Sequence, residues 1–298
     1  NTAANATLTA DIDLGKQEWT PIGHYSTQSA QTKTRKYQGI FEGQGKTITN
    51  LKITKTTKYN ALFGYCENAT IKNLNITNSE VIGETYCGIL LGNNKKSNIS
   101  HCSVLASKLT GTTILGIICG SGTGISVTFE NCFAKDNSVT ANFTSAAKGS
   151  ANVGGLVGNA DRAKLENCYV AETTITNQSD GTKGWGILCG RLATTDTIQN
   201  CYYQKKTDDS NAYDQTYGEE KKAEWFKSEE AVAALDDAYR RDDNVNDGYP
   251  FLRVEAPIDR SGLEAAISEA RKIDRSKYHA KAETDTENAR TEDRYNGE

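Results

Sequence analysis

The eight cysteines of this 298-residue chain have the clearest capacity for chemistry, because thiols can form disulfides, bind zinc or act as nucleophiles. Zinc is disfavoured, since the chain has three histidines and no C-x-x-C pair. Four cysteines instead recur at the fourth position of a six-residue phrase: ISHCSV (99–104), FENCFA (129–134), LENCYV (165–170) and IQNCYY (198–203). An active site needs one catalytic thiol, so cysteines that recur at one repeat position indicate a structural role in the fold.

Paired carboxylates are the second chemistry to consider, since glycosidases and polysaccharide lyases use them for acid–base catalysis. Acidic residues are sparse in the repeats. Glu130 and Glu166 share one repeat position and should be stacked neighbours, but Lys72 and Gln199 occupy the same position in other copies, as on a solvated face. The metallopeptidase motif H-E-x-x-H is absent. We therefore expect no catalytic residues, no metal site and no cofactor.

A second, glycine-rich phrase alternates with the first. It occurs as ALFG (61–64), GILLG (88–92), GIICG (116–120), GGLVG (154–158) and GILCG (186–190). A short Thr-rich piece follows most hexapeptides, so each repeat holds three strand-like pieces, and no helical period separates them. This pattern predicts an all-β protein in which residues 1–205 form a right-handed parallel β-helix, a solenoid of about six coils of three short strands.

The hexapeptide can place its first, fourth and sixth residues inside only if the chain bends before the fourth. The bend falls on Asn73, Asn131, Asn167 and Asn200, with His101 in the remaining copy, and asparagine tolerates the left-handed conformation this requires. We expect its side-chain amides to form a hydrogen-bonded ladder between coils.

The residues after the bend should stack in the interior ~4.8 Å apart. They are Leu74, Cys102, Cys132, Cys168 and Cys201. This arrangement is compatible with buried free thiols and also with a disulfide between Cys102 and Cys132.

Several segments together carry a resemblance to a known family. TADIDL (9–14), WTPIG (19–23) and YQGIFEGQGKTITNLKI (37–53), followed by the two alternating phrases, resemble the GLUG-repeat β-helices of bacterial cell-surface, adhesin-like proteins. The resemblance implies an extracellular location, at the bacterial surface or secreted. NDGYPFLRV (246–254) is similar to the segment that closes such arrays.

The last third of the sequence is predicted to contain a short helical region. Residues 206–256 should form a helical closing segment, with a helix over 219–241 covering the open end of the solenoid. Residues 257–298 resemble part of a FIVAR helical module followed by a disordered tail, because residues 283–298 contain almost nothing apolar.

The composition of the chain narrows the classes of partner that it is expected to bind. A net charge of −4 gives no electrostatic reason to expect nucleic acid, and the apolar runs are too short for direct membrane insertion. The expected function is a non-catalytic extracellular surface module for adhesion or for binding a glycan or host ligand, or a structural stalk. The alternatives are a polysaccharide lyase or glycosidase on the same scaffold, or an ice-binding Thr-bearing face.

Three aromatic residues near coil edges are candidate ligand contacts. Tyr65 and Tyr86 each precede a cysteine, and Trp185 interrupts the glycine phrase at the equivalent edge. Aromatic rings stack on the C–H faces of sugars, so these residues could form a glycan-contacting strip. The other interpretation is edge packing that shields the core.

Overall fold

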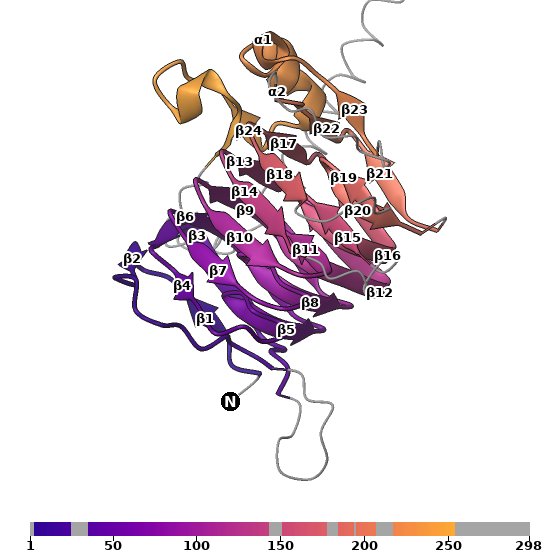
Figure 1. The fold of residues 1–298 in the computed structure, drawn as a ribbon. Coiled ribbons are helices and arrows are strands. Elements are labelled where there is room, and N and C mark those ends of the chain that lie inside the picture. The colour runs from indigo at the N-terminus through magenta and orange to yellow at the C-terminus, as the bar shows by residue number, and fades with distance from the viewer. Residues whose placement is uncertain are drawn as a thin grey trace, which may run out of the picture. The chain divides into compact units, whose positions relative to one another are not determined.

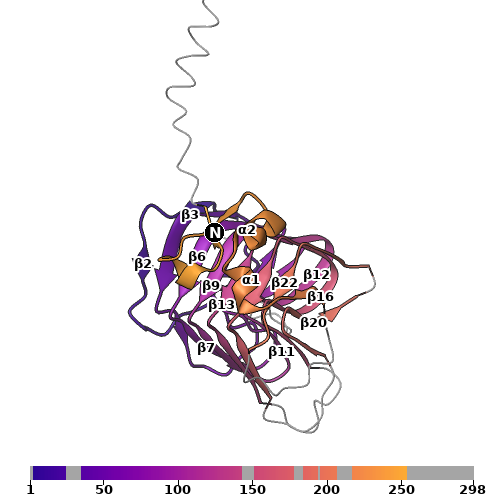
Figure 2. The same cartoon turned by 90° about the horizontal axis from the view of Figure 1, so that it is seen from above.

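The computed structural model describes residues 3–24, 35–142, 151–177, 184–193, 195–206 and 217–253. Within them the chain is mostly β-strand, and the strands of successive repeats lie side by side (Figure 1; Figure 2 from above). The FIVAR-like segment and the tail predicted for residues 257–298 lie outside the described residues.

The largest sheet receives strands from every repeat. Its main path consists of β1 (Ala6–Thr7), β3 (Ile40–Thr49), β6 (Thr70–Thr77), β9 (Asn98–Leu105), β13 (Phe133–Lys135), β17 (Tyr169–Ala171), β22 (Tyr202–Tyr203) and β23 (Glu219–Glu220). The strands off this path are β2 (Ile12–Asp13), β5 (Phe63–Glu67), β8 (Leu91–Lys95), β12 (Cys119–Glu130), β16 (Val157–Glu166), β20 (Cys189–Leu192) and β21 (Thr197–Gln199).

Two smaller sheets complete the repeats. The first contains β4 (Lys52–Ile53), β7 (Glu80–Ile82), β10 (Lys108–Gly111), β14 (Ser138–Ala141) and β18 (Thr174–Asn177). The second contains β11 (Ile114–Gly116), β15 (Asn152–Gly154) and β19 (Trp185–Gly186). The strands in all three sheets pair in parallel, as expected when equivalent pieces of successive repeats stack.

The register confirms the predicted parallel pairing of the hexapeptides. Leu74 pairs with Cys102, and one residue later Ser103 pairs with Phe133, which pairs with Tyr169. Tyr169 in turn pairs with Tyr202. Equivalent positions of the phrase therefore form continuous columns along the stack.

The predicted bend is also confirmed. Backbone φ is 55° at Asn73, 52° at His101, 51° at Asn131, 52° at Asn167 and 49° at Asn200, all in the left-handed region. The expected amide ladder is only partial. Asn200 donates to Asn167 at 3.0 Å, whereas Asn167 donates to Asp236, outside the repeats, at 2.9 Å.

The column after the bend is buried and made of free thiols. Leu74, Cys102, Cys132 and Cys168 are 0% exposed and Cys201 is 3% exposed. In each hexapeptide cysteine the Sγ atom donates to the carbonyl two residues earlier, at 3.2 Å for Cys102 and 3.1 Å for Cys168. The left-handed residue leaves this carbonyl near the interior, so a small side chain with a weak donor suits the position.

A second column of left-handed residues was not predicted. Backbone φ is 50° at Asn78, 48° at Ala106, 57° at Asp136 and 46° at Glu172, one repeat apart. Buried polar residues follow this bend. For example, the backbone N–H of Ser79 donates to Ser107 Oγ at 3.1 Å.

The closing segment differs from the single helix predicted over 219–241. It contains α1 (Ala223–Phe226), α2 (Glu229–Leu235), β24 (Tyr239–Arg240), the 3₁₀ turn η2 (Asn246–Gly248) and β25 (Phe251–Leu252), and β24 pairs with β25 antiparallel. The apolar side chains of this segment pack against Phe133, Tyr169 and Tyr202. Because these residues alternate with inward-facing ones along their strands, the segment packs on the outer face of the late repeats rather than only across their end.

The turn around η2 fixes this docking through polar contacts. Asp247 binds the Nζ atom of Lys135 at 2.7 Å, and Tyr169 Oη donates to the carbonyl of Pro250. The side chain of Lys135 is 2% exposed and also contacts Asp136. The NDGYP sequence therefore closes the array by pairing with a buried lysine and a buried tyrosine.

Removing both carboxylates from Lys135 should open this segment. In the double variant Asp136→Asn and Asp247→Asn, the buried ammonium would lack an opposite charge, which is strongly unfavourable. We expect faster hydrogen exchange over residues 217–253. Adding Lys135→Leu should restore slow exchange, since Leu105 occupies the same register position one repeat earlier. Unchanged exchange in the double variant would contradict this role for Lys135.

Candidate functional site

A groove of about 350 Å³ lies on the outer surface of the early and middle repeats. Its lining combines aromatic, amide and hydroxyl side chains: Tyr59, Tyr65, Tyr86, Asn93, Lys95, Ile114, Ser121, Thr123 and Asn159. We call it the tyrosine groove. Its volume falls in the range of about 300–1,000 Å³ typical of ligand sites.

The floor of the groove is a column set by the sheet register. Tyr65 on β5 pairs with Asn93 on β8, which pairs with Ser121 on β12, which pairs with Asn159 on β16. Glu67, Lys95 and Thr123 form a second column two residues further along the same strands. Residues from different repeats therefore meet because equivalent positions stack.

The final glycine of each glycine-rich phrase brings the wall of the groove against this floor. A Cβ atom at Gly92 would lie 2.8 Å from the carbonyl of Tyr86, and one at Gly120 would lie 2.7 Å from Cys87 N. At Gly158 it would lie 2.6 Å from the carbonyl of Leu115. Only glycine permits this close approach of backbone to backbone, so the glycine phrase has a structural reason for its repetition.

Tyr59 and Tyr86 form an aromatic pair in the wall. Their rings are parallel within 5° with centroids 5.1 Å apart, and both side chains are half-buried. Both residues have a left-handed backbone, with φ of 65° and 58°. This conformation is strained for a large side chain.

One polar atom in the groove lacks a partner within the described residues. The Oδ1 atom of Asn93 is buried and accepts no hydrogen bond. Its neighbours along the column are paired, since Asn159 Nδ2 donates to Ser121 Oγ at 3.4 Å and Arg191 donates to Asn159 Oδ1 at 3.2 Å. The groove thus contains an acceptor that a bound donor could satisfy.

The carboxylate beside the groove is paired with two lysines. Glu67 binds Lys36 at 2.9 Å and Lys95 at 3.5 Å. The hydrogen bond from Lys36 holds the pKa of the Glu67 carboxyl below its ordinary value, so this carboxylate stays ionised at neutral pH. An ionised carboxylate bound to two lysines is a poor general acid.

The predicted aromatic strip of Tyr65, Tyr86 and Trp185 does not exist as one surface. Tyr65 and Tyr86 both line the tyrosine groove, although Tyr65 is 5% exposed. Trp185 is 4% exposed and packs in the central core. The position of Trp185 in the glycine-rich phrase therefore does not place its ring on the surface. Sequence reasoning missed Tyr59 and Asn93, and the only signal for Tyr59 was its place before an early copy of the glycine phrase.

The acidic residues of the second column do not occupy neighbouring strands. Glu67 and Asp161 occupy one column, three strand spacings or ~14 Å apart. Glycosidase carboxylates lie roughly 5–9.5 Å apart. Glu130 and Glu166 are stacked neighbours, as predicted, and do not line the groove. Glu166 binds Lys164 at 2.5 Å.

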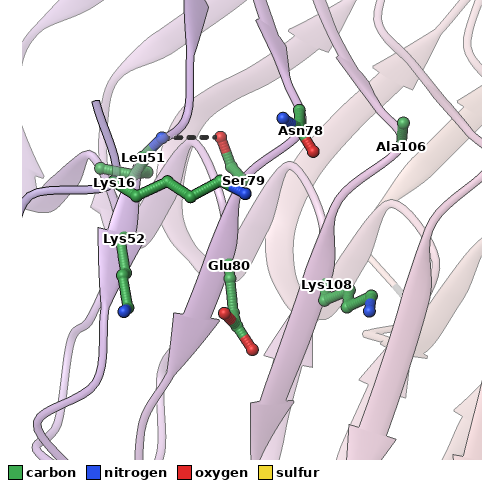
Figure 3. Close-up of a pocket in the computed structure, with 8 residues that line it drawn as sticks. All are labelled: Lys16, Leu51, Lys52, Asn78, Ser79, Glu80, Ala106 and Lys108. Carbon is green, nitrogen blue, oxygen red and sulfur yellow. Dashed lines mark hydrogen bonds between the residues drawn. The ribbon is translucent and has the colours of Figure 1, made fainter. Parts of the chain in front are cut away.

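A smaller hollow of about 140 Å³ lies over the sheet of β4, β7 and β10. Lys52, Glu80 and Lys108 occupy one register position on neighbouring strands, and in Figure 3 the side chains of Lys52 and Glu80 extend in the same direction. Its lining contains no aromatic residue. It therefore lacks the combination of features that marks the tyrosine groove.

The remaining chemistry of the described residues is limited. Burial raises the pKa of the Cys87 thiol to about 12 and that of Cys132 well above its ordinary range, so these thiols are protonated and unreactive. Within the described ranges, no three His, Cys, Asp or Glu side chains are grouped to hold a metal ion. Among the described helices, neither length nor apolar character suffices to cross a membrane.

Stacked repeats whose strands pair in parallel define a mostly-β type of repeat module. Residues 149–176 match the family described as "Glug: The GLUG motif". The fold is similar, at a TM-score of 0.48 and 17% identity, to the crystal structure of a "putative immunoglobulin A1 protease" from Bacteroides ovatus, over 85% of this chain and 87% of that one. No curated protein matches this chain.

Proposed function

We propose that this chain is a non-catalytic extracellular module of a bacterial cell-surface or secreted protein, acting in adhesion through a glycan or host ligand bound in the tyrosine groove. Its three parallel sheets form the walls of a right-handed β-helix, which also serves as a stalk. We propose that the module does not bind nucleic acid and does not insert directly into a membrane.

One observation carries this proposal: the stacked pair of Tyr59 and Tyr86 in the same groove as the side-chain oxygen of Asn93, to which no described residue donates. Aromatic faces bind the apolar faces of sugars, while amide and hydroxyl groups bind their hydroxyls. The GLUG motif at 149–176 supports the assignment to an extracellular repeat protein.

Binding should depend on the aromatic pair. On a glycan array, Tyr86→Ala should weaken the signal of bound sugars roughly tenfold, because a stacking surface is lost. Lys108→Ala is the matched control, since Lys108 lines the smaller hollow, and it should bind like the native chain. No binding by the native chain to any glycan would contradict the proposal.

Polysaccharide cleavage is the second candidate, favoured by the stacking of Glu130 on Glu166. Release of new reducing or unsaturated ends by the native chain, lost in Glu166→Gln, would support this alternative and overturn the non-catalytic assignment.

A further inference from the structure

The chemistry of the tyrosine groove narrows the class of its ligand, on the assumption that the proposed binding function holds. Among the described residues that line the groove, Lys95 is the only charged one, and its Nζ lies 3.5 Å from Glu67 Oε1. Two further cations lie beside the lining and are also engaged, since Lys36 binds Glu67 and Arg191 binds Asn159. An acidic polysaccharide would therefore meet cations that already have partners. The groove suits an uncharged ligand.

The buried oxygen of Asn93 requires a donor from the ligand. It is an acceptor, and no described protein group donates to it. The half-buried hydroxyl group of Thr123 lies in the same lining and can both donate and accept. A ligand with closely spaced hydroxyl or amide groups would pair with both positions.

The strands beneath the groove have no free edge for a peptide. β8 pairs with β5 on one side and with β12 on the other, and β12 continues to β16. An extended peptide would need an unpaired row of backbone groups to add as a strand. A sugar chain needs only the side chains.

The polar column gives the ligand a direction. Tyr65, Asn93, Ser121 and Asn159 span three strand spacings, ~14 Å, parallel to the stacking of the repeats. The backbone of Tyr59 lies against Gly64 and Gly92, and that of Tyr86 lies against Gly92 and Gly120, so the tyrosine pair lies beside the first three strands of the column. We propose that the groove binds an uncharged linear oligosaccharide along the stack, with a sugar ring against the tyrosine pair and later units reaching Thr123 and Asn159.

Calorimetry with defined sugars tests this assignment. The probes are neutral β-1,4-linked oligomers of glucose, mannose and N-acetylglucosamine, from disaccharide to hexasaccharide, with oligogalacturonates and a proline-rich peptide as comparisons. Affinity for at least one neutral series should rise with chain length and change little with salt. The charged oligomers and the peptide should bind more weakly.

Two variants locate the ends of the bound chain. Asn159→Ala should weaken binding of the hexasaccharide roughly tenfold and leave the disaccharide unchanged, because only a long chain reaches that position. Asn93→Ala should weaken both. Asn78→Ala, an exposed asparagine at the smaller hollow, should alter neither.

The outcomes separate this inference from the proposed function. Stronger binding of oligogalacturonates or of the peptide, or equal loss of both sugar lengths in Asn159→Ala, would overturn the neutral-oligosaccharide assignment while leaving the groove as a binding site. A silent glycan array together with no binding in calorimetry would overturn both.

Discussion

Aspartate in place of Cys102 should lower the free energy of unfolding by roughly 3–5 kcal/mol, the range for an uncompensated buried charge. Cys102 has no exposed surface, and its Sγ atom lies 3.2 Å from the carbonyl of Ser100 and 3.8 Å from that of Ile71. A carboxylate there would face two carbonyl oxygens, with Leu74 and the weak thiol donor of Cys132 as its column neighbours. The charge would therefore gain no strong hydrogen bond to replace water.

Two further variants separate charge from shape at this position. Cys102→Val should cost only about 1 kcal/mol, because Leu74 occupies the same column one repeat earlier and an apolar side chain of similar volume remains. Cys102→Asn has the shape of aspartate without its charge and should fall between them. Unfolding in urea measures all three. Equal stability of the aspartate and valine variants would show that the column is not buried.

Alanine at Gly120 should destabilise the chain by roughly 3 kcal/mol, because the added methyl meets backbone rather than flexible side chains. Its Cβ would lie 2.7 Å from Cys87 N, from Gly92 O and from the carbonyl carbon of Tyr86. Relief requires the loop that carries Tyr86 to move. The same variant should therefore also weaken ligand binding in the tyrosine groove.

Gly122→Ala is the matched control on the same strand. Its Cβ would meet the ring edge of Phe129 at 2.9 Å, and Ala160 occupies the paired position in the next repeat. We expect a much smaller loss of stability and normal binding. A thermal melt of each variant gives the comparison, and similar melting temperatures for the two would refute the close-approach explanation of the glycine phrase.

The bend and the cysteine column could be predicted because both depend on local chemistry that the chain repeats. The same residue types return at Asn73, Asn131 and Asn167, and each follows an apolar residue by two positions. The second left-handed column could not be predicted. It uses asparagine, alanine, aspartate and glutamate in turn, since its requirement falls on the backbone and leaves its side-chain type free.

The closing segment was predicted to exist but not where it packs. Phe133, Tyr169 and Tyr202 occupy the fifth position of the hexapeptide, where other copies have Asn75 and Ser103. Only the register shows that these three aromatic rings share one outward column beneath α1 and the 3₁₀ turn. The sequence could not assign them to an outer cluster, because an aromatic residue in a strand is equally suited to the core.

By itself the sequence determined the parallel stacking of equivalent strands, because a repeated motif with one bend and one buried column can satisfy its apolar positions only against its own copies. Only the tertiary structure determined which residues come together in the tyrosine groove. Tyr59, Tyr86, Asn93 and Asn159 are separated by up to one hundred residues and meet only when the register fixes which positions share a column. It also decided that Trp185 is buried, since strand direction and local bends determine the face on which each ring lies.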